Sequence, residues 1–520
     1  MGVSEALSAP DGKPSSSSKS GERYRRLPTG AHGIDPEEVK RDQRERLQSA
    51  IVELIAERGY QAVRILDLTK LAHVSRPTFY SLYDDKEELF LSAYDEIAQR
   101  TARTVIEAYD AQNAPNGHLQ AIRSFAELAV AAPETMSLMV LGAFGAGPKA
   151  LERRNHTLEA LEQSIRVSRD GAGGGARGAT GGKTGPGTER AQETGEDLTV
   201  KVILGGIREV TAARLRKGRV GELPGLADEL AAWAACYPVK LPTGLRVPAP
   251  AAGRGRGSDE GSSEERAELE SASTGEGAGR ESARNGRTRG AGSQSDRALR
   301  AEGRLPSGRH DLTRQFIVKN QRERIVDATA AIVAEKGLAN LTIPAIARRA
   351  NVSHQTFYEM YPTKHDAFLG TQKVGLHQAL LVTVQAYEEN EDDWPRGVAA
   401  GLRALLGYLA SEPSHAHLIL VDTFAASPEA IEIRDTSIHA FAAYLQPGYH
   451  YASKGGTGTV PGVAPEAIAG GIWQVLNFYI EDERTDELPV LAPQLIYAAL
   501  TPFLGPQDAA KVARRAAPRG

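Results

Sequence analysis

Two short runs of the chain hold side chains that could recognise another molecule by hydrogen bonding. The first run begins at Ser75 and continues with Arg-Pro-Thr-Phe-Tyr, and the second begins at Ser353 and continues with His-Gln-Thr-Phe-Tyr. An arginine can donate two hydrogen bonds to guanine, whereas a glutamine can form a bidentate pair with adenine. At the start of a helix these residue types favour contact with base edges, with different preferences in the two runs.

Two helices are predicted before each run, and a tight turn joins the second of them to the run, which forms the third. Apolar residues recur at three- and four-residue steps, as on one face of a helix; they are Leu47, Ile51, Leu54 and Ile55 in the first segment and Ile325, Ala328, Ile332 and Val333 in the second. Gly59 and Gly337 follow as helix C-terminal residues. The second helix is short and passes through Leu68 and Leu71 in the first segment and Ile343 and Ile346 in the second. His73 and Asn351 tolerate the left-handed backbone of a sharp turn, and Ser75 and Ser353 suit the N-cap of the next helix.

The two segments belong to a longer internal repeat. Residues 43–90 align without gaps with residues 321–368, and 18 of these 48 positions are identical. Pro133 and Pro148 match Pro413 and Pro428 at an offset of 280, and the Gly-Gly-Ile of residues 205–207 recurs at residues 470–472, an offset of 265. A unit of about 200 residues therefore occurs twice.

The run A-x-V-S-x-x-T-F-Y-x-x-Y-x-x-K, which ends at Lys86 and again at Lys364, resembles the N-terminal DNA-binding segment of TetR-family transcriptional regulators. The resemblance covers about 50 residues of each copy. It implies an all-α chain of two TetR-like units, each with an N-terminal three-helix helix-turn-helix domain and a C-terminal helical ligand-binding and dimerisation domain. The chain departs from the family at His73 and Asn351, where a small turn residue is usual, and at Arg64, where the family favours the threonine found at Thr342.

The resemblance also implies roles for individual residues. The third helix of each copy would lie in the major groove with its first residues at the base edges, Tyr80 and Tyr358 would face the DNA backbone, and Lys86 and Lys364 would neutralise a phosphate. Arg64 would grip a phosphate where the second copy uses a hydroxyl. The full expected DNA-contacting set is Arg64, Ser75, Arg76, Pro77, Thr78, Tyr80 and Lys86, with Thr342, Ser353, His354, Gln355, Thr356, Tyr358 and Lys364. The aromatic side chains of Phe79, Tyr83, Phe357 and Tyr361 are expected in the core of each three-helix domain.

The C-terminal part of each copy is expected to pair with the other and to hold a small apolar or aromatic ligand, as TetR-like proteins do. The helices expected to form a four-helix bundle are 198–216 with 225–237, and 464–481 with 488–503. Candidate ligand-binding residues are Phe125, Met136, Met139, Phe144, His417, Phe424 and Trp473. An ordinary apolar core explains each of these residues as well.

Composition divides the chain into folded units and connecting segments. Residues 241–310 contain no Phe, Trp or Tyr but 12 Arg and 10 acidic residues, which favours disorder. The expected organisation is a disordered arm (1–35), a helix-turn-helix domain (36–90), a helical domain (91–240) with a Gly-rich loop (170–197), a disordered linker (241–310), a second helix-turn-helix domain (311–368), a second helical domain (369–510) and a tail (511–520). We call residues 36–240 the first half and residues 311–510 the second half, and we call their helix-turn-helix domains the first and second head.

Charge and cysteine content narrow the class of protein. The 520 residues include 62 basic and 66 acidic side chains, a formal charge of −4, which excludes a uniformly basic nucleic-acid coat. A single cysteine, Cys236, cannot form an internal disulfide, and neither a secretory signal nor a run of about 18 apolar residues occurs. We expect a cytoplasmic protein that does not bind membranes.

Motifs for catalysis, metals and cofactors fail their context tests. Gly173, Gly175 and Gly178 fit the GxGxxG pattern but lie in low-complexity sequence, and Arg177 stands where the phosphate-binding loop ending at Lys183 needs a glycine. The sequence has no HExxH motif or paired cysteines, and His415 and His417 face different sides of a helix. We therefore expect no enzyme activity, no metal and no cofactor.

The functional hypothesis is a ligand-responsive DNA-binding transcriptional regulator, acting as a repressor. It would bind a double-stranded operator, respond to a small-molecule effector, and pair either within one chain as a pseudo-dimer or between chains as a homodimer. The alternative is a helical interaction or scaffold protein of the same fold with lost or one-headed DNA binding. Residues 40–90, with nine basic and nine acidic side chains, favour this alternative for the first head, whereas residues 314–368, with eight against five, favour DNA binding.

Overall fold

The computed structural model describes residues 35–110, 116–172, 195–238, 240–245, 247–248, 314–455 and 459–516. Nearly all of the predicted arm and linker, most of the predicted Gly-rich loop and the last four residues of the tail lie outside these ranges. The described residues are helical apart from loops and one two-residue antiparallel pair, β1 with β2, in which Gly195 lies opposite Pro248. The all-α prediction is confirmed.

The first half begins with the three helices of its head and continues with a helical body. Its elements are α2 (Pro36–Arg58), η1 (Tyr60–Ala62), α3 (Ile65–Leu71), α4 (Arg76–Leu82), α5 (Lys86–Asp110), α6 (Asn116–Ala131), α7 (Pro133–Ser137), η2 (Leu138–Gly142), α8 (Ala143–Ala146), α9 (Pro148–Ala172), β1 (Gly195–Glu196), α10 (Thr199–Arg216), η4 (Val220–Glu222) and α11 (Leu223–Ala235), followed by β2 (Val247–Pro248).

The second half repeats this order and has two further helices without a counterpart among the described residues of the first half. Its elements are α13 (Arg314–Lys336), η5 (Leu338–Asn340), α14 (Ile343–Ala350), α15 (His354–Met360), α16 (Lys364–Glu388), α17 (Trp394–Ser411), α18 (Pro413–His417), η6 (Leu418–Asp422), α19 (Thr423–Ala426), α20 (Pro428–Ala443), α21 (Gly448–Gly455), α22 (Ala464–Glu481), η7 (Thr485–Leu491), α23 (Ala492–Leu504) and α24 (Pro506–Arg515). The additions are α21 and α24.

The matched residues of the repeat start and stop matched helices. Gly59 directly follows α2 and Gly337 directly follows α13. Both have a φ of 75°, which a residue with a β-carbon rarely adopts. Proline opens α9 and α20 at Pro148 and Pro428, where a missing backbone N–H costs nothing because that group has no intrahelical partner. Local sequence therefore sets the same helix boundaries in both halves.

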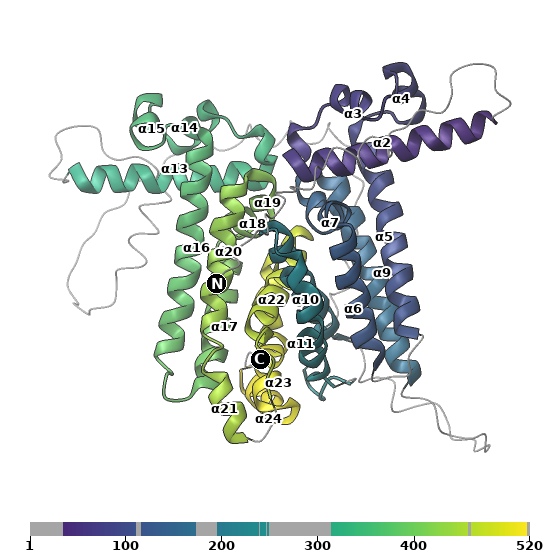
Figure 1. Ribbon diagram of the computed structural model, residues 1–520. Helices are drawn as coiled ribbons and strands as arrows, with labels where there is room; N and C mark the ends of the chain where they lie inside the picture. The colour runs from purple at the N-terminus through teal and green to yellow at the C-terminus, as the bar shows by residue number, and fades with distance from the viewer. Residues whose placement is uncertain are drawn as a thin grey trace, which may run out of the picture.

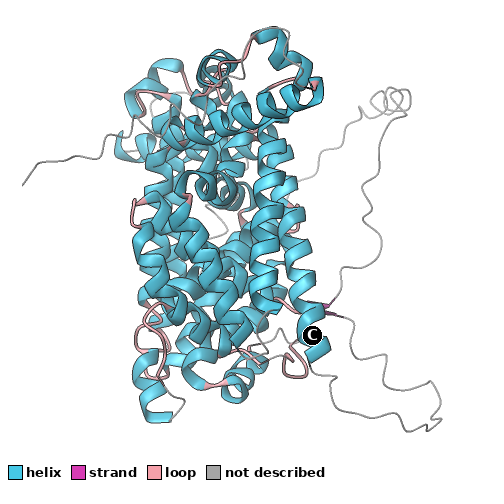
Figure 2. Ribbon diagram, turned by 45° about the vertical axis from the view of Figure 1, so that its right-hand side comes forward, coloured by secondary structure: helices cyan, strands magenta, loops and turns pink. Residues whose placement is uncertain are grey.

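The two halves lie side by side, with both heads at the same end of the molecule (Figure 1). Helices α10 and α22 run next to each other through the centre, and the long helices α5, α6 and α9 of the first half and α16, α17 and α20 of the second half flank them (Figure 1). The view turned by 45° in Figure 2 shows the same stack of long helices beneath the heads. Pairing of α10 with α22 matches the bundle expected from the sequence.

One apolar core joins the halves, and a separate one fills the first head. The larger core combines residues of the first half, such as Val202 and Trp233, with residues of the second half, such as Ile472 and Phe357. The first head and its neighbouring helices form their own cluster around Leu47, Ile51 and Phe79. The second head is therefore packed continuously with the interface between the halves.

Paired glycines allow α10 and α22 to touch backbone to backbone. A β-carbon at Gly206 would clash with the carbonyl oxygen of Ala467, and one at Gly471 would clash with the carbonyl oxygen of Val202. These two contacts involve matched positions of the repeat, so the helices cross about a local twofold axis. Only glycine permits this approach, which explains why the Gly-Gly pair occurs in both halves.

Among the described residues, one helical stretch, Thr485–Leu504, is long and apolar enough to cross a membrane, and the bent pair Gly117–Ala131 and Pro133–Ala146 passes the same test together. The structure buries 72% of the most apolar window of Thr485–Leu504. This stretch is therefore accounted for as part of the helical core.

Candidate DNA-binding surface

A left-handed residue forms the turn between the second and third helix of each head. His73 has a φ of 52° and Asn351 a φ of 50°, as predicted from their tolerance of this conformation. After the turn, the N–H of Val74 donates to the carbonyl oxygen of Thr69, and Val352 donates to Ala347 in the same way. The turn geometry is thus the same in both heads although the residues differ.

An arginine of the first helix holds each turn in place, a role that the sequence analysis missed. Arg46 is almost fully buried, donates to the carbonyl oxygen of Ala72 at 2.8 Å and pairs with Asp42 at 2.7 Å. In the second head Arg324 donates to the carbonyl oxygen of Asn351 at 3.3 Å. The signal was present in the sequence, because both arginines lie in the identical Gln-Arg-Glu-Arg run of the repeat.

Serine caps begin the third helix of each head. The Oγ of Ser75 accepts from the N–H of Thr78 at 3.1 Å and lies 2.7 Å from the Thr78 hydroxyl. Ser353 makes the same contacts with Thr356, at 3.0 Å to the N–H and 2.9 Å to the hydroxyl. Both N-cap predictions are confirmed. The caps fix where α4 and α15 begin and hence which side chains occupy their first turn.

Replacing Ser75 or Ser353 by alanine should lower the free energy of unfolding of its own head by about 1 kcal/mol, because an N–H of the first turn loses its acceptor. Urea unfolding followed by circular dichroism would measure this change. Ser81→Ala is the matched control, since the Ser81 hydroxyl donates to the carbonyl oxygen of Thr78 and caps no helix. A loss from Ser81→Ala as large as that from Ser75→Ala would contradict the capping role.

The recognition helices α4 and α15 each bury one aromatic ring and expose the next. Phe79 and Phe357 are fully buried, whereas Tyr80 and Tyr358 are each 56% exposed. Tyr83 and Tyr361 are also buried, which confirms the prediction that these four inner rings form the core of the heads. The edge of each buried ring packs against the exposed tyrosine, with centroids 5.3 Å apart in the first head and 5.8 Å apart in the second.

The first turn of each recognition helix presents different chemistry to solvent. Arg76 and Pro77 are exposed in the first head, and His354 and Gln355 are exposed in the second. The Gln355 side chain donates to the carboxylate of Glu359 at 3.1 Å, a contact that must open if its amide is to reach a base. Thr78 and Thr356 are half-buried beside their serine caps.

The two lysines after the recognition helices make contacts within the protein that the sequence analysis did not anticipate. The Nζ of Lys86 donates to the carbonyl oxygens of Tyr60 and Val63, both at 2.9 Å, and burial lowers the pKa of Lys86. The Nζ of Lys364 donates to the carbonyl oxygen of Leu341 at 2.8 Å, and its side chain is exposed. Since an ammonium has three N–H donors, one remains at Lys86 and two at Lys364 for a phosphate.

Arg64 and Thr342 occupy equivalent N-cap positions at the start of α3 and α14. The hydroxyl of Thr342 accepts from the N–H of Ala345 at 3.3 Å, so it is used as a cap. Arg64 is exposed, and its backbone N–H donates to the carboxylate of Asp67 at 3.2 Å. The Arg64 side chain is thus at the surface of the first head.

An apolar cavity of about 90 Å³ lies inside the second half. Residues of α16, α17, α20 and α22 line it, among them Leu376, Leu405, Phe441 and Trp473. Such a volume holds several water-sized groups, and its apolar walls favour an apolar occupant over water. The sequence analysis named only Trp473 of these, because the others have no feature that separates a cavity wall from ordinary core.

The remaining six candidate ligand residues lie elsewhere. Phe144 and Phe424 stack on each other across the interface, with centroids 4.0 Å apart. His417 lies 2.7 Å from Asp422, and although burial opposes it, the hydrogen bond and charge of that carboxylate raise the pKa of His417. Phe125, Met136 and Met139 pack in the core of the first half. The structure therefore does not bring the seven candidates together in one pocket.

Within the described ranges, no group of three or more His, Cys, Asp or Glu side chains could hold a metal ion.

Comparison with known proteins matches a family model to both heads. Residues 47–93 and residues 325–369 each match the family model described as bacterial regulatory proteins, tetR family. These two segments contain both recognition helices and both serine caps. No curated protein matches the chain.

Proposed function

This chain is a tandem member of the tetR family of bacterial regulatory proteins, and we propose that it is a ligand-responsive repressor whose two halves act together on one DNA operator. The N-terminal domains of this family indicate a DNA-binding transcription regulator. The proposal adds pairing of the halves within one chain, an effector and the sign of regulation.

The observation that carries the DNA-binding proposal is the exposure of both recognition helices. Tyr80 and Tyr358 are equally exposed on serine-capped helices at the same end of the molecule (Figure 1). Two such helices read adjacent major grooves when they lie about one helical turn of DNA apart, roughly 35 Å. Because Arg76 and Pro77 face solvent in one head and His354 and Gln355 in the other, the expected operator is not a palindrome.

The proposed effector is a small apolar molecule in the cavity of the second half. Trp473 supports a link to DNA binding, because it lines the cavity and also belongs to α22, which packs against α10 of the first half. A ligand shifts an equilibrium only through different affinities for two states. We propose that occupation of the cavity tilts α22 against α10, changes the spacing of the heads and releases the operator.

The alternative remains an interaction or scaffold protein with lost or one-headed DNA binding. Its support is confined to the first head, where the acidic and basic residues of positions 40–90 balance and Lys86 has only one free donor. Members of this family are generally not enzymes. We propose that the protein acts in the cytoplasm, where the operator would be accessible.

Replacing Tyr80 or Tyr358 by alanine should weaken operator binding by about tenfold each, since a hydrogen bond to a charged phosphate is worth about 1.5 kcal/mol or more. The measurement uses the purified full chain and a duplex that it selects from a randomised DNA pool. Tyr109→Ala, on α5 in the body of the first half, is the control. Wild-type affinity in both tyrosine variants would rule out the two-headed proposal, and loss in only one would support the one-headed alternative.

Salt dependence separates the proposed regulator from a scaffold. In a plot of log affinity for DNA against log salt concentration, each phosphate that the protein neutralises makes the slope more negative by about 0.9. A scaffold protein that does not bind DNA has no such slope.

A further inference from the structure

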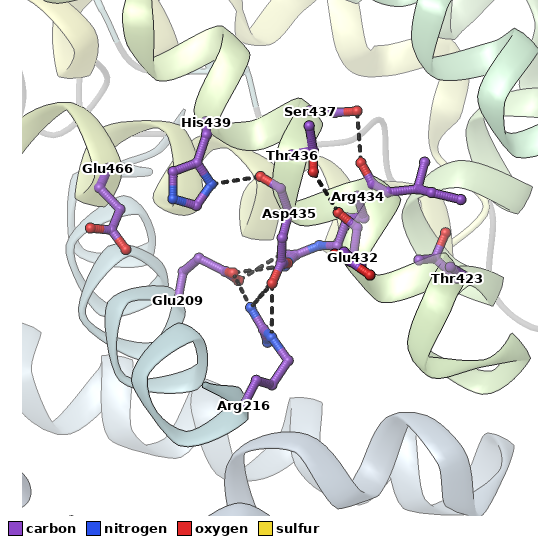
Figure 3. A network of polar contacts seen from close by, with 12 residues as sticks. Glu209, Arg216, Thr423, Glu432, Arg434, Asp435, Thr436, Ser437, His439 and Glu466 are labelled. Carbon is purple, nitrogen blue, oxygen red and sulfur yellow. Dashed lines mark hydrogen bonds and ion pairs between the residues drawn. The ribbon is translucent and has the colours of Figure 1, made fainter. Parts of the chain in front are cut away.

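Among the described residues, four ion pairs cross the interface between the halves. Three of them involve α10, and the fourth joins Arg154 of α9 to Glu481 of α22 at 3.8 Å. The guanidinium of Arg434 on α20 donates to both carboxylate oxygens of Glu209 on α10, at 2.6 and 2.7 Å. Arg216 of α10 donates to both carboxylate oxygens of Asp435 at 3.0 Å (Figure 3). Arg214, two positions before Arg216 on α10, pairs with Glu466 in the first turn of α22. All six side chains of the three α10 pairs are largely buried, so their charges interact strongly.

The repeat generates a second contact that corresponds to the first two pairs. Helices α9 and α20 match at an offset of 280 and α10 and α22 match at 265, so Arg154 corresponds to Arg434 and Gln474 to Glu209. Arg154 donates to the side-chain oxygen of Gln474 at 2.6 Å, in the place of the ion pair. The contact is therefore built twice about the local twofold axis, once with full charges and once with a neutral partner.

The next residues along the same helices also correspond. Asn155 stands where Asp435 stands, and Glu481 stands where Arg216 stands. The amide of Asn155 donates to the carboxylate of Glu481 at 2.9 Å. Both versions of this contact are favourable between unlike halves, because the amide of Asn155 donates to the carboxylate of Glu481 and Arg216 pairs with Asp435.

Pairing of two first halves would bring like charges together. In the chain Arg214 of the first half meets Glu466 of the second half. The first-half residue that corresponds to Glu466 is Lys201. A second copy of the first half in the same arrangement would therefore place Lys201 opposite Arg214, twice per pair and away from bulk water. Charged groups of the same sign at such positions disfavour the pairing.

Pairing of two second halves would bring carboxylates together. Asp435 meets Arg216 of the first half, and the second-half residue that corresponds to Arg216 is Glu481. Asp435 would then face Glu481, and Arg434 would face the neutral Gln474 in place of Glu209 while it keeps its contact with Asp435. Each half thus carries one like-charge contact against a copy of itself, Lys201 with Arg214 or Asp435 with Glu481. Two first halves would also place Arg154 opposite Glu209, so their rejection rests on the Lys201–Arg214 contact alone.

We propose that these charges make the two halves obligate unlike partners, so that Arg214 and Arg216 of α10 pair with Glu466 and Asp435 of the second half. This inference rests on the proposed function in one respect: a regulator built in this way always presents one head of each kind to the operator. The pairing rule itself concerns only the interface and does not depend on DNA binding.

Two substitutions reproduce the rejected pairs inside the natural interface. Arg216→Glu places a carboxylate opposite Asp435, as a second-half pair would, and Glu466→Lys places an ammonium opposite Arg214, as a first-half pair would. In the full-length chain each should lower the melting temperature by several degrees. The reversed pair Glu466→Lys with Arg214→Glu should recover most of the loss caused by Glu466→Lys. Asp435→Arg should not rescue Arg216→Glu, because Arg216 also pairs with Glu209 at 2.9 Å and Asp435 also pairs with Arg434 at 2.8 Å. Lys511→Glu is the control, because the side chains of Lys511 and its ion-pair partner Asp508 are both exposed.

The particle mass in solution provides the second measurement. The wild-type chain should have a mass near 55.6 kDa. Wild-type melting and mass in both single variants, or failure of Arg214→Glu to recover the stability lost in Glu466→Lys, would overturn the proposal. A particle of twice that mass, in which Lys201→Cys and Arg214→Cys form a disulfide between chains, would overturn it too. If the mass and the melting temperatures are as expected but the chain binds no operator, the result counts against the proposed function alone.

Discussion

Replacing Arg434 by alanine should destabilise the protein by about 3–5 kcal/mol, because a buried carboxylate would be left without its main partner. Arg434 is fully buried, its guanidinium binds both oxygens of Glu209, and it also lies over the rings of Phe424 and Trp473. Although burial alone would raise it, the charges of Arg434 and Arg216 hold the pKa of Glu209 at about 2. The carboxylate therefore stays ionised at neutral pH, and its burial depends on these two arginines.

The chain contains its own control for this prediction. Arg154 occupies the corresponding position, is also buried, and has the neutral Gln474 as its closest partner across the interface. Arg154 also lies 3.8 Å from the carboxylate of Glu481, but that carboxylate keeps the amide of Asn155 as a donor when Arg154 is removed. Arg154→Ala should therefore cost about 2 kcal/mol less than Arg434→Ala. Urea unfolding at neutral pH measures both. Equal losses would mean that packing, and not the ion pair, dominates at Arg434.

The pH dependence has a defined sign. The folded-state pKa of Glu209 lies below its ordinary value of 4.5. Its contribution to stability is therefore complete above that ordinary value and is lost as the pH falls toward 2. The difference between Arg434→Ala and the wild type should shrink over this range, because the protonated carboxyl no longer needs a cation.

Replacing Arg76 or Gln355 by alanine should weaken operator binding by roughly 5- to 150-fold, since a bidentate contact to a base is worth about 1–3 kcal/mol. Both side chains are exposed in the first turn of their recognition helices. Each substitution should relax sequence preference in one half-site only, because each head has its own recognition helix. The measurement is the affinity of the full chain for the selected duplex and for duplexes altered in one half-site at a time.

A control distinguishes base recognition from the loss of any positive charge. Arg58 ends α2, is exposed and pairs with Glu57, so Arg58→Ala removes a charge from the same head without altering the recognition helix. It should leave sequence preference unchanged. If Arg76→Ala and Arg58→Ala weaken all duplexes equally, Arg76 contacts no base. If Gln355→Ala leaves binding unchanged, the Gln355–Glu359 contact persists on DNA.

The heads could be predicted in detail because their geometry is encoded locally. A left-handed residue at His73 or Asn351, a serine cap at Ser75 or Ser353 and a fixed apolar spacing each constrain neighbouring residues only. The lysines could not be fully predicted in the same way. The partners of Lys86 are the carbonyl groups of Tyr60 and Val63, more than 20 positions earlier, which only folding brings near.

The cavity of the second half was not predicted, for the same reason. Phe144 and Phe424 were candidates for a cavity wall, yet they stack on each other across the interface. Side-chain type identifies apolar residues, but whether packing leaves a void depends on how four helices meet. Leu376, Leu405 and Phe441 line the cavity and have no local feature that marks them.

The sequence alone determined the helical class, the duplicated heads and the residues that each recognition helix displays, because periodicity, caps and turn residues act over a few positions. Only the tertiary structure decided which charged side chains meet. Glu209 and Arg434 are 225 residues apart, and their contact exists because the glycine pairs of α10 and α22 let two backbones touch and bring α20 beside α10. Electrostatic partners across an interface are set by distance in space, and the sequence does not contain that distance.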